Sequence, residues 1–350
     1  MNTAASTAKP GVSVVICCHN SAHLLPETIS HLRGQRHAGA CNWEVLVVDN
    51  ASTDDTAAAA AKLWGEMPGV GFRVVAEPRL GLAHARLRGL ESAAYDVISF
   101  IDDDNWVCED WVTRVYGIFL QDSQIGACGG LNEPVFAVPP PVWFPRFQNS
   151  YAVGPQSDAG GDITWKEGVL CGAGLTIRKP AWQQLKADGF EFTLLGRQGR
   201  KVLCGEDYEL CLALRAAGWK IWYEPALTLR HYLPASRLNW RHLRRMVRKY
   251  GFVKLRLAAL GHRSYGEIVT REQLLESYDW DSACMRLWKG ITRNPHRLFF
   301  PNSKKHEGDP YVIENEIAIG EICELLELRN KYKLYIDGIA NAKWNRKYLR

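Results

Sequence analysis

The amino-acid sequence predicts an α/β fold, with a mostly parallel sheet flanked by helices and a helical C-terminal extension. Three observations carry this prediction. Short β-branched apolar runs alternate with segments of helical periodicity, which is typical of βαβ units. The 350 residues are 47% hydrophobic and 23% charged, as in an ordinary folded protein with a sizeable core. Beyond residue 236 helical patterns dominate.

The first part of the chain alternates regularly between the two kinds of segment. Each strand-like run ends in polar residues, first His19, then Asp49, then Asp102. Because ligands bind outside the carboxyl ends of parallel strands, we expect these polar residues to converge at one edge of the sheet. The expected strands are 12–17, 44–48, 72–76 and 97–101, and the expected helices are 24–32, 56–63, 82–94 and 110–120.

The acid triplet Asp102, Asp103 and Asp104 closes the last of these strands. Three adjacent carboxylates repel one another unless a cation neutralises them, and Mg²⁺ or Mn²⁺ prefers oxygen ligands and bridges to substrate phosphates. The triplet is therefore a candidate metal–diphosphate site. A solvated loop or a helix N-cap explains the triplet equally well in isolation, and its position level with Asp49 and His19 favours the metal.

From residue 132 the composition of the chain changes. The stretch 132–155 is rich in proline and aromatic residues, and we expect a loop that packs on its own rings rather than on a sugar. The glycines of 168–174 allow a close backbone approach before a strand at 175–177. Glu206 and Asp207 open a helix, either as caps or as functional carboxylates. A strand at 220–223 and then His231 follow.

Several classes of protein are excluded or disfavoured. The net charge of +5 is too small to indicate a nucleic-acid partner. The ten cysteines are scattered without metal-type spacing, so a reduced cytoplasmic setting is expected. Residues 1–10 carry no apolar leader and are expected to be disordered, and no run is long enough to span a bilayer. A dinucleotide fingerprint, a P-loop and the glycine-rich loop of a nucleotidyltransferase are all missing from the strand–helix turns.

In order along the chain, the motifs resemble those of the inverting glycosyltransferases of family 2. That family has the GT-A (nucleotide-diphospho-sugar transferase) fold. The resemblance covers 11–235, with 11–130 as the nucleotide-sugar-binding half, 131–235 as the acceptor-binding half and 236–350 as a helical C-terminal region. The motifs are VSVVICCHN at 12–20, VVDNASTDDT at 47–56, Gly81 with Ala85-Arg86, the acid triplet, Gly172-Ala173-Gly174, Gly205-Glu206-Asp207, and Gly218-Trp219 leading to Pro225 and His231.

The resemblance implies a role for individual residues. Asp104 would hold a divalent metal, Mn²⁺ or Mg²⁺, and Asp207 would be the general base, with Glu206 as the alternative. For His231 a structural role is favoured over a metal or phosphate contact. His19 stands where the family usually has Tyr or Phe, so the resemblance does not identify the nucleotide. The implied nucleotide-sugar-binding residues are Cys17, His19, Asp49, Arg86 and Asp103.

The implied activity is metal-dependent, inverting transfer of a sugar from a nucleotide-diphospho-sugar to a hydroxyl of a glycan or lipid-linked acceptor, in bacterial cell-surface polysaccharide synthesis. A metal would stabilise the leaving diphosphate, and one carboxylate base would activate the hydroxyl. The alternative is a non-catalytic nucleotide-sugar-binding or scaffold protein with the same fold. A scaffold has no need of acids at both 102–104 and 206–207, which favours the enzyme.

Basic and apolar residues share helical spacing over 237–256. Such a helix either lies peripherally on the inner face of the cytoplasmic membrane, holds an acidic or lipid-diphosphate acceptor, or docks on the catalytic domain with a solvated basic side. A long helical pattern over 315–339 is a further expected element and a candidate for a homo-oligomer contact.

Overall fold

A computed structural model describes residues 9–36, 41–194, 197–198, 201–202, 204–261, 285, 288, 292, 295–328 and 331–346. Within these ranges the centre is a nine-stranded sheet in the order β3-β2-β1-β4-β8-β6-β11-β5, with β7 paired to β11. The strands of this sheet are β1 (Lys9–Cys18), β2 (Trp43–Asp49), β3 (Gly71–Ala76), β4 (Tyr95–Asp102), β5 (Asn105–Val107), β6 (Ile125–Phe136), β7 (Gly161–Asp162), β8 (Thr176–Arg178) and β11 (Lys220–Leu233). A separate hairpin joins β9 (Arg197–Gln198) to β10 (Lys201–Val202).

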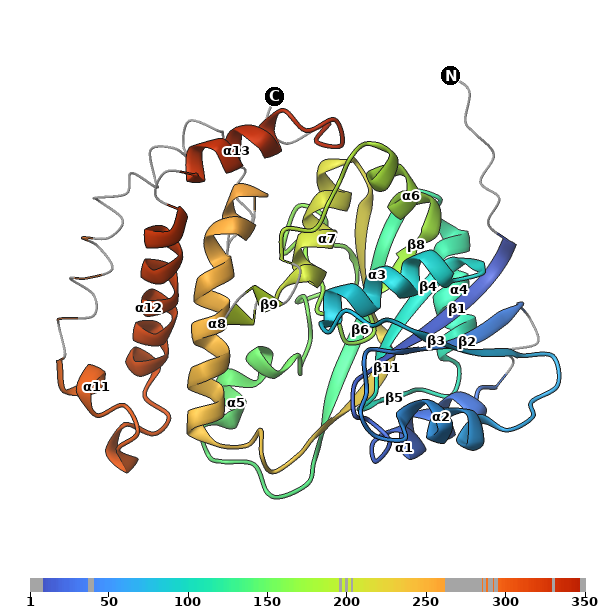
Figure 1. Cartoon of the computed structure of the whole chain (residues 1–350), viewed down its shortest axis with the longest axis horizontal. Coiled ribbons are helices and arrows are strands. Elements are labelled where there is room, and N and C mark those ends of the chain that lie inside the picture. Colours follow the sequence, from blue (N-terminus) through green and yellow to red (C-terminus); the bar gives the residue numbers. More distant parts are fainter. Residues whose placement is uncertain are drawn as a thin grey trace.

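Helices cover both faces of the sheet and extend beyond it (Figure 1). Those before residue 236 are α1 (Leu25–Arg33), α2 (Thr56–Trp64), α3 (Leu82–Ser92), α4 (Trp111–Gln121), α5 (Phe144–Phe147) with the 3₁₀ turn η2 (Gln148–Tyr151), α6 (Lys179–Ala187) and α7 (Glu206–Ala216). Those of the C-terminal region are α8 (Trp240–Ala259), α11 (Pro295–Phe299), the 3₁₀ turn η3 (Lys304–His306), α12 (Pro310–Leu328) and α13 (Tyr332–Ala340).

The predicted α/β architecture is confirmed. Strands β1, β2, β3, β4, β6 and β11 run in one direction, whereas β5, β7 and β8 run against them. The expected strands and helices of residues 12–120 are all present, with ends shifted by a few residues. In the register of the sheet Cys18 lies opposite Asp49, and Cys17 lies opposite Asp102. The strand ends therefore meet at one edge, as expected.

Alternation along β1 divides the core into two layers. Val15 and Cys17 point into a core shared with α3, α6 and α7, whereas Val14 and Ile16 point into a core shared with α1, α2 and α4. This period of two is the geometry of a strand that is buried on both faces. It explains why the run 12–17 is continuously apolar.

Two expectations need correction. The stretch 132–155 is not all loop, because β6 continues through Pro134 to Phe136, where β11 pairs with it. As expected, the aromatic residues of the stretch pack together and against α8, where Trp143, Phe144 and Tyr151 are buried. The pattern 315–339 is not one helix but parts of α12 and α13, because α13 turns back over the end of α8 and buries Tyr332, Ile336 and Ile339 (Figure 1).

Helices α8 and α12 lie side by side with their backbones in contact. A Cβ on Gly251 would come within 2.2 Å of the Ile317 carbonyl oxygen, and a Cβ on Gly320 within 2.3 Å of the Arg248 carbonyl oxygen. Next to this crossing Glu316, 3% exposed, accepts hydrogen bonds from Arg244 at 2.7 Å and from Arg248. The basic helix is therefore docked on its own chain, although one strip of its surface stays exposed.

Replacing Glu316 by glutamine should lower the free energy of unfolding by about 3 kcal/mol, because a buried Arg244 loses its carboxylate partner. The loss should stay at the lower end of the range for buried pairs, since Arg248 is partly exposed and can turn to water. Urea unfolding followed by tryptophan fluorescence measures it. The matched control is Glu314→Gln on the exposed side of α12, which should change stability by no more than about 0.5 kcal/mol. Equal losses in both variants would contradict the role of this ion pair.

None of the described helices combines the length and the apolar character needed to cross a membrane.

Candidate active site

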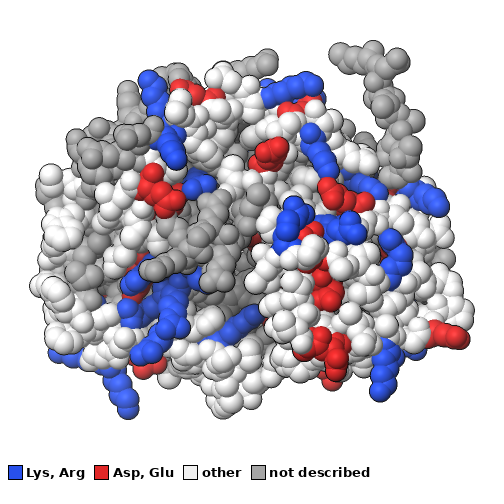
Figure 2. Space-filling model, in the orientation of Figure 1, with Lys and Arg blue, Asp and Glu red and all other residues white. Residues whose placement is uncertain are grey.

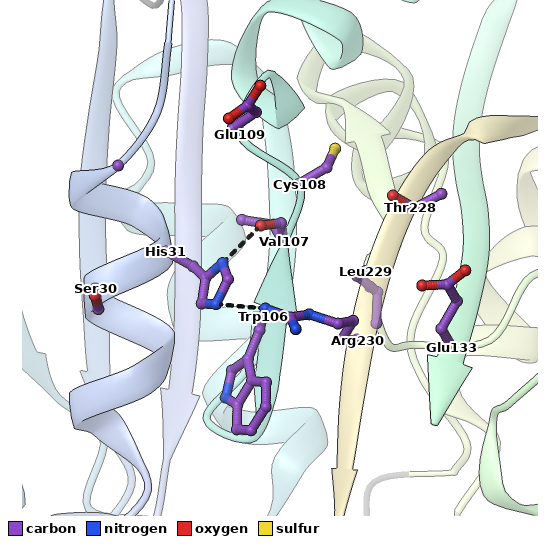
Figure 3. A pocket seen from close by; sticks show the side chains of 11 residues that line it. Ser30, His31, Trp106, Val107, Cys108, Glu109, Glu133, Thr228, Leu229 and Arg230 are labelled. Carbon is purple, nitrogen blue, oxygen red and sulfur yellow. Dashed lines mark hydrogen bonds between the residues drawn. The ribbon is translucent and has the colours of Figure 1, made fainter. Parts of the chain in front are cut away.

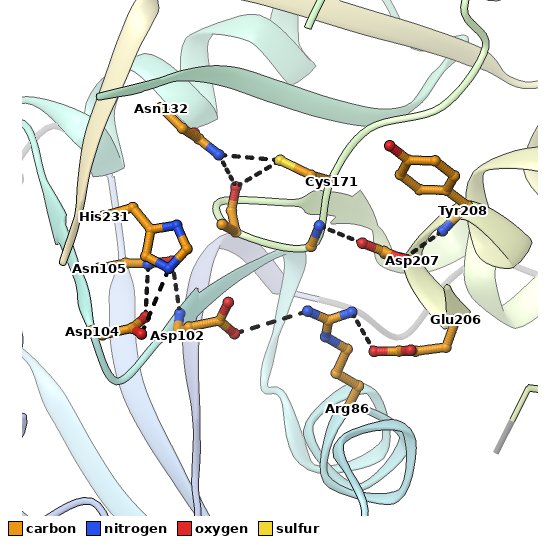
Figure 4. Close-up of polar contacts among 12 residues, drawn as sticks. Arg86, Asp102, Asp104, Asn105, Asn132, Cys171, Glu206, Asp207, Tyr208 and His231 are labelled. Carbon is orange, nitrogen blue, oxygen red and sulfur yellow. Dashed lines mark hydrogen bonds and ion pairs between the residues drawn. The ribbon is translucent and has the colours of Figure 1, made fainter. Parts of the chain in front are cut away.

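Each acid of the triplet has a different partner, and Figure 4 shows those of Asp102 and Asp104. Strand β4 ends at Asp102, and the turn through Asp103 and Asp104 leads into β5, which pairs with β11 so that Asn105 lies opposite His231. Asn105 fixes the turn, because its side-chain oxygen accepts from the Asp102 backbone N–H at 3.1 Å and its amide donates to Asp104 at 3.1 Å. The three carboxylates thus leave the turn in different directions.

Asp102 faces Arg86, which links the triplet to α7. The guanidinium of Arg86 lies 3.8 Å from the Asp102 carboxylate and donates to Glu206 at 2.9 Å. Arg86 is 5% exposed and sits so close to Gly172 that a Cβ there would be 2.0 Å from its Nη2. Burial raises the pKa of Glu206, and the charge of Arg86 opposes that rise. The side chain expected to meet the nucleotide is therefore held by two acids.

Asp103 is held from the loop after β1. Ser21 donates to its carboxylate, and the Thr28 hydroxyl donates to its backbone oxygen at 2.7 Å. Burial raises the pKa of Asp103 to about 7, against the hydrogen bond from Ser21 and with help from the neighbouring charges of Asp104 and Asp102. Asp103 thus links the acid triplet to the loop after β1 and to α1.

Asp104 is the most enclosed acid of the triplet, at 4% exposure, and it meets two cationic or basic side chains. Its Oδ2 lies 3.2 Å from Arg237 Nη1 and 3.6 Å from His231 Nε2, and these two nitrogens are 3.3 Å apart. Burial opposes ionisation, but His231 and Arg237 outweigh it, so the pKa of Asp104 falls below its ordinary value. Asp104 is therefore ionised at neutral pH.

The residues around Asp104 fit a divalent cation. Arg237 Nη1 and His231 Nε2 lie 3.3 Å apart and both lie within 3.6 Å of the Asp104 carboxylate, so the imidazole nitrogen and the carboxylate meet at one point. A positively charged group already lies where both ligand atoms converge. In the part of the chain that the structure describes, no cluster of three or more His, Cys, Asp or Glu could hold a metal. A cation bound here would thus have few protein ligands and would complete its shell from substrate phosphate and water.

Asp207 stands in the first turn of α7, where it is partly exposed. Its Oδ2 accepts from the Gly172 backbone N–H at 2.6 Å and its Oδ1 accepts from the Tyr208 N–H at 2.9 Å. Glu206, by contrast, is 6% exposed and bound to Arg86. Of the two acids, Asp207 is the more exposed.

The remaining residues expected at the nucleotide lie at the ends of β1 and β2. The Cys17 side chain is buried in the core at the floor of the site, and burial raises the pKa of its thiol. His19 is exposed, and its Nδ1 lies 2.8 Å from the Asn50 backbone oxygen. Asp49 accepts from the Ser52 N–H at 3.2 Å. All expected site residues therefore lie along one edge, but Cys17 and Arg86 offer little free surface.

Sequence reasoning missed two contributors. Arg237 comes from the loop before α8, and only its place in a basic stretch marked it. Asn132, 1% exposed, donates to the Ala152 backbone oxygen at 3.0 Å and lies 3.1 Å from Cys171 Sγ, so it holds the loop that meets Asp207. Nothing in the local sequence distinguishes this asparagine from others.

A separate pocket of about 400 Å³ lies on the other side of the β5–β11 ribbon (Figure 3). Trp106 and Arg230 are a register pair next to Asn105 and His231, so strand alternation sends them to the opposite face. Arg230 lies over the Trp106 ring at 5.5 Å and its Nη2 is 3.0 Å from His31 Nε2. None of the expected site residues lines this pocket.

Known proteins resemble this chain in sequence and in fold. The profile described as "Glycosyl transferase family 2" matches residues 13–183. "Succinoglycan biosynthesis protein ExoM" of Rhizobium meliloti is 28% identical over 91% of this chain and 94% of its own length. "Putative glycosyltransferase EpsH" of Bacillus subtilis is 30% identical, and that match covers only 35% of this chain and 35% of EpsH.

Among solved structures, the mannosyltransferase PcManGT of Pyrobaculum calidifontis, in complex with GDP-Man and Mn²⁺, is similar over 92% of this chain and 88% of its own, with a TM-score of 0.57. The identity is 19%, so this likeness concerns the fold.

Proposed function

The chain belongs to glycosyl transferase family 2, and from that premise we propose that it moves a sugar from a nucleotide-diphospho-sugar to a hydroxyl of a glycan or lipid-linked acceptor, with inversion and with a divalent metal. One observation carries the proposal. Arg86 ties the triplet at Asp102 to α7 at Glu206, so the candidate metal residue Asp104 and the candidate base Asp207 belong to one connected site. The likeness to ExoM supports a role in polysaccharide synthesis.

The reaction that this arrangement supports is a single displacement. The Asp207 carboxylate takes the proton of the acceptor hydroxyl, whose oxygen forms a bond to the anomeric carbon of the donor sugar. The bond from that carbon to the diphosphate breaks on the opposite side, and the nucleoside diphosphate leaves with the electron pair. The backbone N–H groups of Gly172 and Tyr208 orient Asp207 for this task.

Asp104 and His231 are the residues that would hold the metal, because their ligand atoms converge and Asp104 is ionised. When bound, Mn²⁺ or Mg²⁺ would neutralise the charge that develops on the leaving diphosphate. Asp103, Asp49 and the backbone near Cys17 and His19, which lie at neighbouring strand ends, would bind the nucleotide part of the donor.

A thermal-shift screen of GDP- and UDP-sugars, with and without Mn²⁺, tests donor binding. A ligand at a hundred times its Kd should stabilise the protein by about 2.7 kcal/mol. Donors that bind are then incubated with lipid-linked and free glycan acceptors, and the anomeric configuration of the product is read by NMR. Metal-dependent donor binding followed by an inverted product supports the proposal. Donor binding without turnover or donor hydrolysis would favour the non-catalytic binding protein instead.

Arg237→Gln should tighten Mn²⁺ binding by about 2–5-fold, because the variant removes a cation from the point where Asp104 and His231 converge. The effect is expected to be modest, since the Arg237 side chain is 41% exposed. Electron paramagnetic resonance of free Mn²⁺ in a titration measures the Kd without any turnover. Arg88→Gln, an equal change of charge at an exposed position of α3, is the control and should leave the Kd unchanged. A weaker Mn²⁺ affinity in Arg237→Gln alone would show that Arg237 supports the metal rather than competing with it.

A further inference from the structure

Helix α8 carries two sets of basic side chains. One set is neutralised by α12: Arg244 and Arg248 by Glu316, Lys254 by Glu321 and Arg256 by Glu324. The other set is Arg241, Arg245 and Lys249, which we call the α8 cation row. These side chains are exposed, and none of them forms an ion pair with another described residue. Figure 2 shows Lys and Arg side chains gathered over α8 on this face of the molecule.

The α8 cation row follows a single strip of the helix. Steps of four residues rotate by about 40°, so the row stays within an arc of about 80° and spans about 12 Å. Its neighbours on one side face the catalytic half of the chain. His242 stacks on Tyr151 of η2 at 6.2 Å, and Val253 lies 3.5 Å from where a Cβ on Gly205 would be. The row therefore borders the side of α8 that meets the site.

The two ends of the basic strip lie near the two halves of the site. Arg237, just before α8, contacts Asp104 at 3.2 Å. At the other end, burial raises the pKa of Cys204 to about 12 and the charge of Lys249 opposes that rise. Cys204 is followed directly by the Gly205-Glu206-Asp207 turn. A molecule lying along the row would thus extend toward the turn that carries Asp207, the candidate base.

The row is electrostatically costly for the protein alone. Like charges four residues apart destabilise a helix by a few tenths of a kcal/mol per pair, roughly 0.2–0.5. Their field also reaches His242, whose pKa is lowered by burial and then by Arg237, Lys249 and Arg245. An anionic ligand would relieve this repulsion.

A bilayer surface fits the row poorly. A helix that lies in a membrane interface exposes an apolar face between its cations. On α8 the apolar residues are instead buried against α12 and η2, and no large hydrophobic side chain of this helix is among the exposed ones in the described chain. The observations favour a discrete anionic group over a lipid surface.

We propose that the α8 cation row binds the phosphate groups of a phosphate- or diphosphate-linked acceptor and so presents the acceptor hydroxyl to Asp207. This inference rests on the proposed glycosyl transfer and names the acceptor class that it uses. Lys and Arg are the usual partners of phosphate, through charge-assisted hydrogen bonds.

The test measures the Kd of geranyl diphosphate for the full-length protein by isothermal titration calorimetry. GDP or UDP and Mn²⁺ are present at saturating concentration, so that the donor site is filled. Geraniol, which lacks the phosphates, is the neutral control ligand. The variant Arg241→Gln/Arg245→Gln/Lys249→Gln should bind geranyl diphosphate at least about tenfold more weakly. The control variant Arg33→Gln/Arg88→Gln/Lys62→Gln loses the same charges from exposed positions on α1, α3 and α2 and should bind as the unmodified chain does.

Sedimentation with vesicles of phosphatidylcholine and phosphatidylglycerol separates the two sources of phosphate. The proposal is supported if the Arg241→Gln/Arg245→Gln/Lys249→Gln variant loses binding of geranyl diphosphate but keeps binding of the vesicles. Loss of vesicle binding alone would overturn it in favour of membrane docking, and unchanged binding of both probes would make the row a solvated surface. If neither nucleotide binds, the proposed function fails on its own. The calorimetric comparison of the two triple variants with geranyl diphosphate still decides on the row.

Discussion

Asp207→Asn should lower the rate of sugar transfer by about 10²–10⁴-fold, the range for loss of a general base. The amide cannot take the proton of the acceptor hydroxyl, but its oxygen can still accept from the Gly172 or the Tyr208 N–H. The fold and donor binding should therefore survive. Initial rates at saturating donor, compared with the melting temperature and the nucleotide Kd, measure this.

Glu206→Gln is the informative companion variant. Glu206 is buried and bound to Arg86, so its loss should disturb stability and the link to Asp102 more than proton transfer. Full activity in Asp207→Asn together with an inactive but folded Glu206→Gln protein would move the base to Glu206.

Asp104→Asn should lower transfer by about 10²–10³-fold, because the leaving diphosphate loses several kcal/mol of charge stabilisation when the metal is weakly held. The amide has no charge to attract the cation away from water. Mn²⁺ titration by electron paramagnetic resonance should show a weaker Kd before any turnover is measured.

Asp103→Asn provides the contrast for that experiment. Its carboxylate is bonded to Ser21 and does not contact His231 or Arg237, so Mn²⁺ affinity should change less than donor affinity. If Asp103→Asn weakens Mn²⁺ binding as much as Asp104→Asn does, the metal is held by the triplet as a whole rather than by Asp104.

The periodicity of the sequence was sufficient to predict the sheet and the edge at which its strands end in polar residues. The apolar run through Ile16 and the polar residues after each strand are local signals, and the parallel arrangement brings their ends together. The partners of those residues were not predictable from spacing. Arg86 lies between Asp102 and Glu206 only because α3 and α7 pack on the same face, which no local pattern encodes.

The C-terminal region shows the same limit. The helical periodicity correctly predicted helices at α12 and α13. The change of direction between them depends on the buried surface against which Ile336 packs. His231 was expected to be structural, and its register with Asn105 sets it beside Asp104, a position that its local sequence did not reveal. Tertiary pairing of strands, rather than the residue types, decided its place.

The short segment from His231 to Arg241 has a practical consequence for exchanging parts between relatives. It begins beside Asp104, passes Arg237 and enters α8, which Gly251 and Gly320 fix against α12 without room to shift. A hybrid enzyme joined within this segment would combine α8 from one parent with the residues around Asp104 from the other. A junction placed before β11 would transfer β11, α8 and α12 together. It should therefore preserve the position of α8 relative to the residues around Asp104.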